Sequence, residues 1–262
     1  MKAGVCGICG RMGRAVLDVL LQRGHSLACA FDSSSSAYYG KDAGALVSDK
    51  LGVIVSPVND DVEKCSCVID FSSPDASMEL LAAAVRHKTP VVIGTTGFSD
   101  EQKTEIEKAS KVIPLVFSPN MAVGVNLLFK LTETAAAVLG DDFDVEILEI
   151  HHRLKKDAPS GTAKRLADIV KEHMNGMAGA RAVTGRNGLT GERESAEIGI
   201  MALRGGDAVG EHTVYFIGEG ERIELTIRST KRDTDAKGAV VAAEVLNGRP
   251  AGFYSMYDVL GL

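Results

Sequence analysis

Side chains that could transfer protons and bind anions are concentrated just after residue 150. Two histidines, one arginine and two lysines lie there together: His151, His152, Arg153, Lys155 and Lys156. Histidine donates and accepts protons near neutral pH, and lysine supplies a second donor or an anion contact. This density favours a site for a small dianionic substrate that gains a proton, although a solvated basic loop would have the same composition.

The same segment leads into Ser160, Gly161 and Thr162, directly before a helix predicted over residues 163–171. The N–H groups of a first helical turn lack intrahelical partners, and serine or threonine hydroxyls cap them. Such a helix end also attracts carboxylates, because its backbone dipoles leave partial positive charge there. These three residues therefore predict a place for a substrate carboxylate, the alternative being an ordinary capped helix.

A second candidate site is a glycine-rich turn near the start of the chain. It reads Gly7-Ile8-Cys9-Gly10-Arg11-Met12-Gly13, which departs from G-x-G-x-x-G because Cys9 replaces the middle glycine. Glycines between a strand and a helix let the backbone approach a pyrophosphate, whose charge the helix N-terminus stabilises. Asp32 ends the next predicted strand, where a carboxylate can bind an adenosine ribose. The pattern predicts a dinucleotide site, the alternative being a turn without a ligand.

The residues after Asp32 bear on the choice of coenzyme. A carboxylate at this place repels the 2′-phosphate of NADPH unless a nearby arginine compensates. Here Ser33 to Ser36 follow, and Lys41 is the nearest downstream cation. We therefore expect NADH to be preferred, with NADPH as a second coenzyme.

Two further polar turns follow predicted strands. They read Gly94-Thr95-Thr96-Gly97 and Ser118-Pro119-Asn120-Met121. Ligands bind at the carboxyl ends of the strands in an open α/β sheet, so both turns are candidates for the coenzyme site. Either could equally be a simple connection.

The cysteines favour reduced thiols over a disulfide framework or a metal site. There are five, an odd number, and all lie in the first quarter of the chain: Cys6, Cys9, Cys29, Cys65 and Cys67. A zinc site would need Cys6-x-x-Cys9 and Cys65-x-Cys67 to converge. Cys6 lies within a predicted strand and Cys9 within the glycine turn, so we expect no metal.

Apolar patterning divides the chain into two regions. Up to residue 117, short apolar runs alternate with helical patterns, which predicts a doubly wound parallel sheet of the Rossmann type. Its predicted strands are 3–8, 27–31, 67–71, 91–94 and 113–117, and its helices are 15–21, 78–85 and 100–110. Partly alternating strands at 144–150, 198–203, 211–217 and 222–228 predict a second, α+β domain on an open mixed sheet. We also expect a long loop over 175–195 and a tail helix over 236–246.

Composition excludes several classes of protein. The 262 residues carry a net charge of −6, which argues against nonspecific nucleic-acid binding. No uninterrupted apolar run approaches the roughly 18 residues that span a bilayer, and the first residues lack a signal-peptide pattern. We expect a cytoplasmic protein that does not bind membranes.

Taken together, these stretches resemble the dihydrodipicolinate reductase family, also called 4-hydroxy-tetrahydrodipicolinate reductases, of the bacterial diaminopimelate route to lysine. The most specific stretches are residues 149–153 and 157–162. Further matching stretches lie along the rest of the chain, at 10–13, 93–97, 124–126, 190–193 and 209–213. The resemblance therefore covers essentially the whole chain.

The resemblance implies an architecture and a reaction. Residues 1–121 with 232–262 would form the dinucleotide-binding domain, and 122–231 the domain for substrate binding and oligomerisation. The family assembles as a homotetramer through the open sheet. Its reaction is the NAD(P)H-dependent reduction of 4-hydroxy-tetrahydrodipicolinate to tetrahydrodipicolinate, with loss of water.

It also implies roles for the candidate residues. The pyrophosphate would lie on Gly7, Ile8, Cys9, Gly10, Arg11 and Met12. Asp32 would bind the ribose. The nicotinamide side would be lined by Gly94, Thr95, Thr96, Ser118, Pro119, Asn120 and Met121. His151 would donate the proton with Lys155 as its partner. The substrate carboxylates would be held by His152, Ser160, Gly161 and Thr162.

Two positions depart from the family pattern. Ser33 stands where the family often has an arginine next to the ribose-binding acid, which bears on NADPH. Asp235 stands where the family commonly has a phenylalanine before an Ala-x-Gly-Ala stretch. If that phenylalanine shapes the nicotinamide pocket, its contact is lost or replaced here.

Two other functions fit parts of the sequence. Another small-dicarboxylate dehydrogenase, such as an aspartate dehydrogenase, would keep the coenzyme and change the substrate. A semialdehyde dehydrogenase would need a nucleophilic cysteine in its catalytic domain, and no cysteine follows Cys67. A non-catalytic dinucleotide-binding protein would not need the basic segment after residue 150.

Overall fold

The computed structural model describes residues 1–231 and 233–262. The chain divides into two compact units. The first contains residues 1–123 and takes up the chain again from residue 233, and the second begins at Gly124. The expected return of the chain at residue 232 falls on the one residue outside the described part.

The first unit is built on a seven-stranded sheet in the order β12-β6-β5-β4-β1-β2-β3, and every strand pairing in it is parallel. Its strands are β1 (Lys2–Cys6), β2 (Ser26–Phe31), β3 (Val55–Ser56), β4 (Cys67–Asp70), β5 (Val91–Ile93), β6 (Pro114–Phe117) and β12 (Gly252–Tyr254). The chain moves from β1 to β2 on one side and then crosses to β4 on the other, so the strand order reverses at β1. Such a reversal opens a crevice at the carboxyl ends of the strands.

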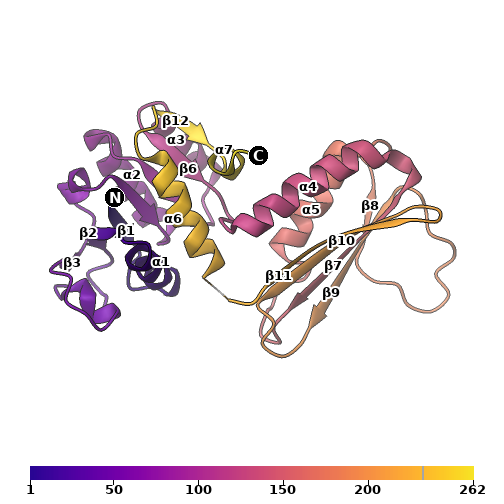
Figure 1. The fold of residues 1–262 in the computed structure, drawn as a ribbon, viewed down its shortest axis with the longest axis horizontal. Helices are drawn as coiled ribbons and strands as arrows, with labels where there is room; N and C mark the ends of the chain where they lie inside the picture. The colour runs from indigo at the N-terminus through magenta and orange to yellow at the C-terminus, as the bar shows by residue number, and fades with distance from the viewer. Residues whose placement is uncertain (232) are drawn as a thin grey trace. The chain divides into compact units, whose positions relative to one another are not determined.

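Helices cover both faces of this sheet (Figure 1). They are α1 (Arg11–Gln22), α2 (Pro74–His87), α3 (Asp100–Ser110), α6 (Thr234–Leu246) and α7 (Met256–Leu260), with short 3₁₀ helices at Ala43–Leu46 and Asp60–Lys64. Successive strand residues point to opposite faces. Val5 therefore joins the core under α1 and α6, and Cys6 joins the core under α2 and α3. This confirms the doubly wound parallel sheet.

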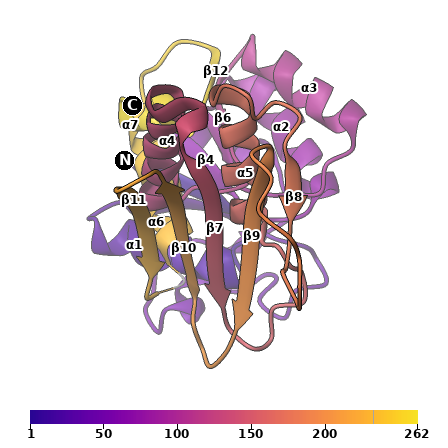
Figure 2. The same ribbon diagram turned by 90° about the vertical axis from the view of Figure 1, so that its right-hand side faces the viewer.

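The second unit contains a mixed five-stranded sheet in the order β11-β10-β7-β9-β8. Its strands are β7 (Asp144–His151), β8 (Arg181–Val183), β9 (Glu197–Arg204), β10 (Gly210–Ile217) and β11 (Arg222–Ser229). β7 pairs antiparallel with β10 and parallel with β9. The helices α4 (Val123–Leu139) and α5 (Gly161–His173) lie on one face of the sheet (Figure 2), and a 3₁₀ turn spans Gly140–Asp142. This confirms the open mixed sheet.

One element of the second unit differs from the expectation. The segment 175–195, expected to be a loop, contains the short strand β8, which pairs in parallel with β9. Arg181 Nη2 lies 3.1 Å from Glu197 Oε2 across this pairing. A strand of three residues is too short to show an alternating pattern, so the tertiary pairing alone defines it.

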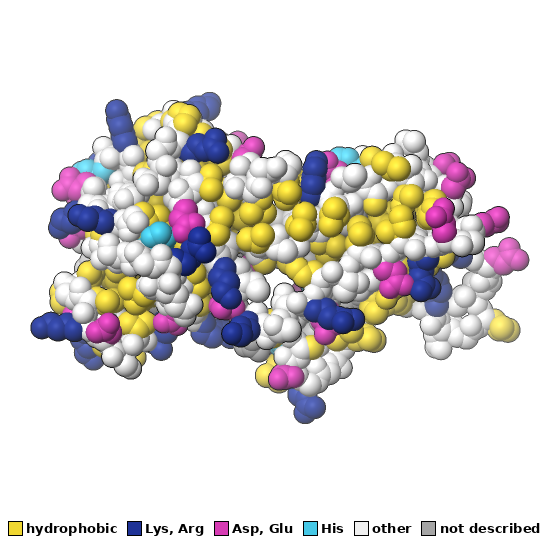
Figure 3. Space-filling model, in the orientation of Figure 1, with side chains coloured by type: hydrophobic (Ala, Val, Ile, Leu, Met, Phe, Trp, Pro, Cys, Tyr) yellow, Lys and Arg dark blue, Asp and Glu magenta, His cyan; other side chains and the backbone are white. Residues whose placement is uncertain are grey.

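Helix α4 is the most apolar helix of the chain. Residues Val123–Asp142 are long and apolar enough to cross a bilayer by length and composition, and they are the one such helix in the part of the chain that the structure describes. This is weak support for a membrane span, because a helix that covers a sheet passes the same test. Leu127, Leu131 and Val138 are exposed along it, and Figure 3 shows apolar side chains gathered there.

Candidate functional site

The glycine-rich turn joins β1 to α1 as the sequence predicts. Gly7 has a φ of +73°, which a residue with a side chain rarely adopts. A Cβ atom on Gly13 would lie 2.1 Å from the carbonyl oxygen of Gly7. Gly10 is the N-cap of α1 and makes no side-chain cap. The glycines therefore bring the helix N-terminus close to the strand and leave backbone N–H groups beside the turn.

The side chains of this turn point in different directions. Ile8 is completely buried, so only its backbone faces a ligand. Cys9 and Met12 are half-buried, and Arg11 is exposed. A pyrophosphate at the turn would therefore meet mainly backbone groups.

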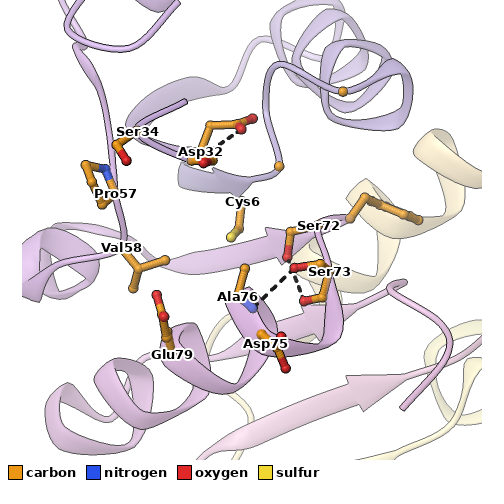
Figure 4. A pocket seen from close by; sticks show the side chains of 14 residues that line it. Cys6, Asp32, Ser34, Pro57, Val58, Ser72, Ser73, Asp75, Ala76 and Glu79 are labelled. Carbon is orange, nitrogen blue, oxygen red and sulfur yellow. Dashed lines mark hydrogen bonds between the residues drawn. The ribbon is translucent and has the colours of Figure 1, made fainter. Parts of the chain in front are cut away.

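Asp32 is fixed beside the turn by backbone donors. Its Oδ2 atom accepts a hydrogen bond from Cys9 N at 2.8 Å, and its Oδ1 atom accepts one from Ser33 N at 2.8 Å. Asp32 lines a cavity of about 600 Å³ (Figure 4). The other residues of its wall are Cys6, Gly7, Gly10, Ser33, Ser34, Pro57, Val58, Phe71, Ser72, Ser73, Asp75, Ala76 and Glu79. The carboxylate and the glycine turn thus face one cavity.

Two cations lie near this turn, Arg14 and the Lys41 that follows Asp32 in the sequence. Arg14 Nε donates to the carbonyl of Cys9 at 3.0 Å. The Arg14 guanidinium lies 5.1 Å from the centre of the Tyr38 ring, and Lys41 Nζ lies 5.9 Å from the same centre. Both distances suit a cation over an aromatic face. The charge of Asp32 is therefore accompanied by nearby positive charge.

The Gly94-Thr95-Thr96 turn lies next to β4. Gly94 N donates to the carbonyl of Asp70 at 2.9 Å. A Cβ on Gly94 would lie 2.2 Å from the Phe71 ring, so only glycine fits there. Thr95 is buried, whereas Thr96 is exposed. Of the two threonines, only Thr96 presents its side chain freely.

The Ser118-Pro119-Asn120-Met121 segment is held in place by β5 and α6. Ser118 N donates to the carbonyl of Ile93 at 3.1 Å. Asp235 Oδ1 accepts hydrogen bonds from Met121 N at 3.0 Å and from Ala122 N at 3.2 Å. Asp235 therefore fastens the end of this segment to α6 by its carboxylate.

In the second unit, His151 belongs to a cluster around a buried carboxylate. Glu149 has no exposed surface and lies two residues before His151 on β7, so both side chains point to the same face. His151 Nδ1 lies 2.5 Å from Glu149 Oε2. Arg204 donates to both oxygens of Glu149, at 2.7 and 2.8 Å. The carboxylate orients the imidazole through Nδ1, so Nε2 is the ring nitrogen on the side away from Glu149.

Charge within this cluster is compensated locally. Burial acts to raise the pKa of Glu149, but hydrogen bonds from Arg204 and His151 outweigh it and hold the pKa below its usual range. Arg204 also donates to the carbonyl of Asp157 at 2.8 Å. Glu149 is therefore ionised at neutral pH, and its partner Arg204 links the strand to the basic segment.

His212 packs against His151. The two rings meet edge to face, with centres 5.2 Å apart. Burial, with the positive charges of His151 and Lys155, lowers the pKa of His212 to about 4. Its Nε2 atom lies 3.0 Å from Ser160 Oγ. His212 is therefore a neutral partner of Ser160.

The expected substrate-binding residues differ in how exposed they are. Ser160 is buried, caps α5 by accepting from Ala163 N at 3.2 Å, and donates its own N–H to Glu149 at 3.1 Å. Gly161 is exposed, and Thr162 and His152 are half-buried. Ser160 thus shapes the helix start, while the other three are more open to a ligand.

Lys155 lies in the same segment as His151. Its Nζ atom pairs with Asp157 Oδ1 at 2.9 Å, and its side chain is 21% exposed. A partly exposed ammonium on a flexible stem can move to an anionic ligand.

Sequence reasoning assigned no role to three members of this cluster: Glu149, Arg204 and His212. The period of two along β7 could have placed Glu149 beside His151. Arg204 and His212 come from β9 and β10, and only strand pairing brings them near. Within residues 1–231 and 233–262, no three His, Cys, Asp or Glu side chains are grouped to hold a metal.

Comparison with known proteins identifies the family. Residues 1–121 match the model for the dihydrodipicolinate reductase N-terminus, and residues 124–260 match that for its C-terminus. A 4-hydroxy-tetrahydrodipicolinate reductase of Aromatoleum aromaticum is 46% identical over 267 residues, covering 100% of this chain and 96% of the relative. One of Syntrophotalea carbinolica is 47% identical over 265 residues, covering 100% and 99%.

Solved structures show the same fold. A dipicolinate-bound dihydrodipicolinate reductase from Paenisporosarcina sp. TG-14 has a TM-score of 0.78 at 23% identity, with 98% of each chain covered. The gentamicin-biosynthesis protein GenD2 in complex with NAD has a TM-score of 0.58 at 14% identity, covering 99% of this chain and 90% of its own. With family models matching nearly the whole sequence and relatives above 45% identity, the chain belongs to the dihydrodipicolinate reductase family, NAD(P)H-dependent oxidoreductases of the diaminopimelate route to lysine.

Proposed function

We propose that this chain reduces 4-hydroxy-tetrahydrodipicolinate with a proton from the His151 cluster and a hydride from bound NAD(P)H. The observation that carries the proposal is the Glu149–His151–Arg204 array beside the start of α5. It combines an oriented imidazole with a helix N-terminus, and thus a proton donor with a carboxylate site. A small dicarboxylate that gains a proton needs both.

His151 is the proton donor in this proposal. Glu149 holds its Nδ1 side, so the proton leaves from Nε2. A Cβ on Gly210 would lie 3.1 Å from that nitrogen, and the glycine therefore keeps the space beside it open. Lys155 assists as a second cation that can leave Asp157 for the substrate.

The substrate carboxylates bind at the start of α5 and at the basic segment. Gly161 and Thr162 contribute the helix N-terminus, and His152 contributes a ring whose Nδ1 already accepts from Leu154 N at 3.2 Å. Ser160 acts through its cap and through His212. The dipicolinate-bound relative supports a ligand with two carboxylates.

The residues of the first unit fit a dinucleotide. A Cβ on Gly7 or on Gly13 would strike backbone within 2.3 Å, so both glycines keep the turn closely packed at the helix N-terminus. Residues 7–12 would hold the pyrophosphate, and Asp32 would accept hydrogen bonds from the ribose hydroxyls. Gly94 to Thr96 and Ser118 to Met121 would line the nicotinamide side. The hydride itself is the chemistry of the coenzyme.

NADH is the preferred coenzyme in this proposal, with NADPH also used. Asp32 favours ribose hydroxyls, and Ser33 brings no positive charge. Arg14 and Lys41 at Tyr38 supply the charge that lets a 2′-phosphate approach.

We further propose a cytoplasmic homotetramer formed through the open sheet. Strand pairing puts Leu148 beside Met201, and Ile150 beside Leu203, on the face opposite Val145 and Ile147. Partly exposed apolar side chains on one sheet face suit burial against another copy. Five free cysteines suit a reducing compartment.

The test is oxidation of NADH and NADPH, side by side, with substrate made in situ from pyruvate and aspartate semialdehyde by the preceding synthase. We expect oxidation that depends on the synthase and is faster with NADH. Folded protein that binds NADH but oxidises neither coenzyme would refute the reaction and leave a dinucleotide-binding protein. Coenzyme oxidation only with the products of aspartate dehydrogenation would instead indicate another dicarboxylate dehydrogenase.

A further inference from the structure

Asp70 is a fully buried carboxylate that the proposed chemistry does not use. It ends β4, the strand next to β1, and none of its surface is exposed. Ser72 Oγ donates to its Oδ1 at 2.5 Å, and Thr95 Oγ1 donates to its Oδ2 at 3.1 Å. Ser77 Oγ also donates to Oδ2, and Ser72 N donates to Oδ1 at 3.1 Å. Four hydrogen bonds therefore converge on one side chain.

Burying a carboxylate is unfavourable unless donors replace the water it loses. Burial raises the pKa of Asp70, while the hydrogen bonds from Ser72, Ser77 and Thr95 oppose that rise. An apolar residue could fill the same space without needing any donor. A network of this size at one carboxylate therefore suits a role in fixing geometry.

Three partners of Asp70 lie at or just after the ends of three strands, at the carboxyl edge of the sheet. Cys6 ends β1, and its thiol interacts with the Asp70 carboxylate. Ser72 follows β4 and Thr95 follows β5. Ser72 N also donates to Thr95 Oγ1 at 2.9 Å, which closes a triangle of Asp70, Ser72 and Thr95. The carboxylate thus ties the ends of three adjacent strands.

Two of these partners face the coenzyme cavity. Cys6 and Ser72 belong to the wall that also contains Asp32 and Gly10 (Figure 4). Asp70 itself lies behind that wall. Ser77, by contrast, lies in α2 and does not line the cavity.

We propose that Asp70 is a positioning residue for the coenzyme, which fixes Ser72 and Thr95 at the ends of β4 and β5 so that the cavity wall keeps one shape. The inference deepens the proposed function and rests on it, because the cavity is taken as the dinucleotide site. Asp70 acts through its partners and does not touch the ligand.

The experiment compares four variants: Asp70→Asn, Thr95→Val, Thr95→Ser and Ser77→Ala. For each, the Kd of NADH is measured by fluorescence titration, together with kcat and the melting temperature. We expect Asp70→Asn and Thr95→Val to raise the Kd of NADH about tenfold. Each substitution weakens the hydrogen bonds between Asp70 and its partners, so the cavity wall no longer keeps one shape. Thr95→Ser keeps the hydroxyl and should restore the wild-type Kd.

Ser77→Ala is the matched control. It removes one donor from the same carboxylate but leaves Ser72 and Thr95, the two partners at the ends of β4 and β5, in place. It should therefore lower the melting temperature without weakening the binding of NADH. The positioning role is refuted if Ser77→Ala and Thr95→Val raise the Kd of NADH equally. It is also refuted if Asp70→Asn binds NADH like the wild type. Thr95→Val decides the matter should Asp70→Asn fail to fold.

The two hypotheses fail in different ways. Wild-type protein that binds NADH without turning over substrate refutes the reaction, while the Kd comparison among variants still judges Asp70. Wild-type protein that binds neither NADH nor NADPH refutes both the dinucleotide site and the role of Asp70.

Discussion

The two candidate sites of this chain are made of different chemical groups. The glycine turn of the first unit offers mainly backbone N–H groups, and its side chains mostly point into the core or into solvent. The cluster of the second unit is made of side chains from β7, β9 and β10 around one buried carboxylate. A backbone site depends on the absence of side chains, whereas a side-chain site depends on which charged groups are paired. The two sites should therefore respond to different substitutions.

The largest effect is expected in the side-chain site. His151→Gln keeps a polar side chain but removes the acid, and Lys155→Ala removes its partner. Each should lower kcat by about 100-fold or more while NADH still binds. Steady-state kinetics would measure this, with His173→Gln on the exposed side of α5 as control. Near-normal kcat in both variants would refute the assignment.

Gly13→Ala should break the backbone site. The new methyl group would meet the Gly7 carbonyl at 2.1 Å, so the helix N-terminus must move away from the strand. We expect the Kd of NADH to rise about tenfold or more in a titration. Gly179→Ala places its methyl group in open space and should leave the Kd unchanged. Equal affinity in Gly13→Ala and the wild type would contradict a backbone-built site.

The pH dependence of stability should reveal the side-chain site without any ligand. The pKa of His212 is about 4 in the folded chain and near its ordinary value of 6.5 when unfolded. The unfolded state therefore binds the proton first, and stability present above pH 6.5 is lost as the pH falls toward 4. The slope should approach about 1.4 kcal/mol per pH unit within this window.

Urea unfolding of the wild type and of His212→Gln at several pH values would measure this difference. The variant should lack that part of the slope. Carboxylates with lowered pKa values, such as Glu149, lose their contribution to stability at lower pH. They are present in both proteins and therefore do not affect the difference between the two curves. Parallel stability curves would show that His212 is not held neutral by the fold.

The smallest effect concerns coenzyme choice. Arg14→Ala should weaken the binding of NADPH about fivefold and that of NADH less than twofold, because only NADPH carries the extra phosphate charge. Ser33→Arg should act in the opposite direction and favour NADPH. The ratio of kcat/KM for the two coenzymes measures both, with exposed Lys50→Ala as control. If Arg14→Ala weakens the binding of both coenzymes equally, Arg14 acts by holding the glycine turn through its hydrogen bond to Cys9.

Much of this molecule follows from local sequence pattern. Short apolar runs and glycine punctuation predicted the parallel sheet, because a buried parallel strand has no polar face. The glycine turn was predictable since only glycine tolerates the φ of Gly7 and the close approach at Gly13. The basic segment with His151 and Lys155 was visible as a run of neighbouring residues.

Tertiary structure decided which groups are paired. Arg204 and His212 reach Glu149 and Ser160 only because β9 and β10 flank β7, and no local pattern encodes that order. The same holds for Asp235, which lies more than 110 residues from the Met121 N–H that it accepts from. Sequence periodicity sets the direction of each side chain, but long-range strand and helix packing sets its partner. Burial then fixes the charge that each partner can carry.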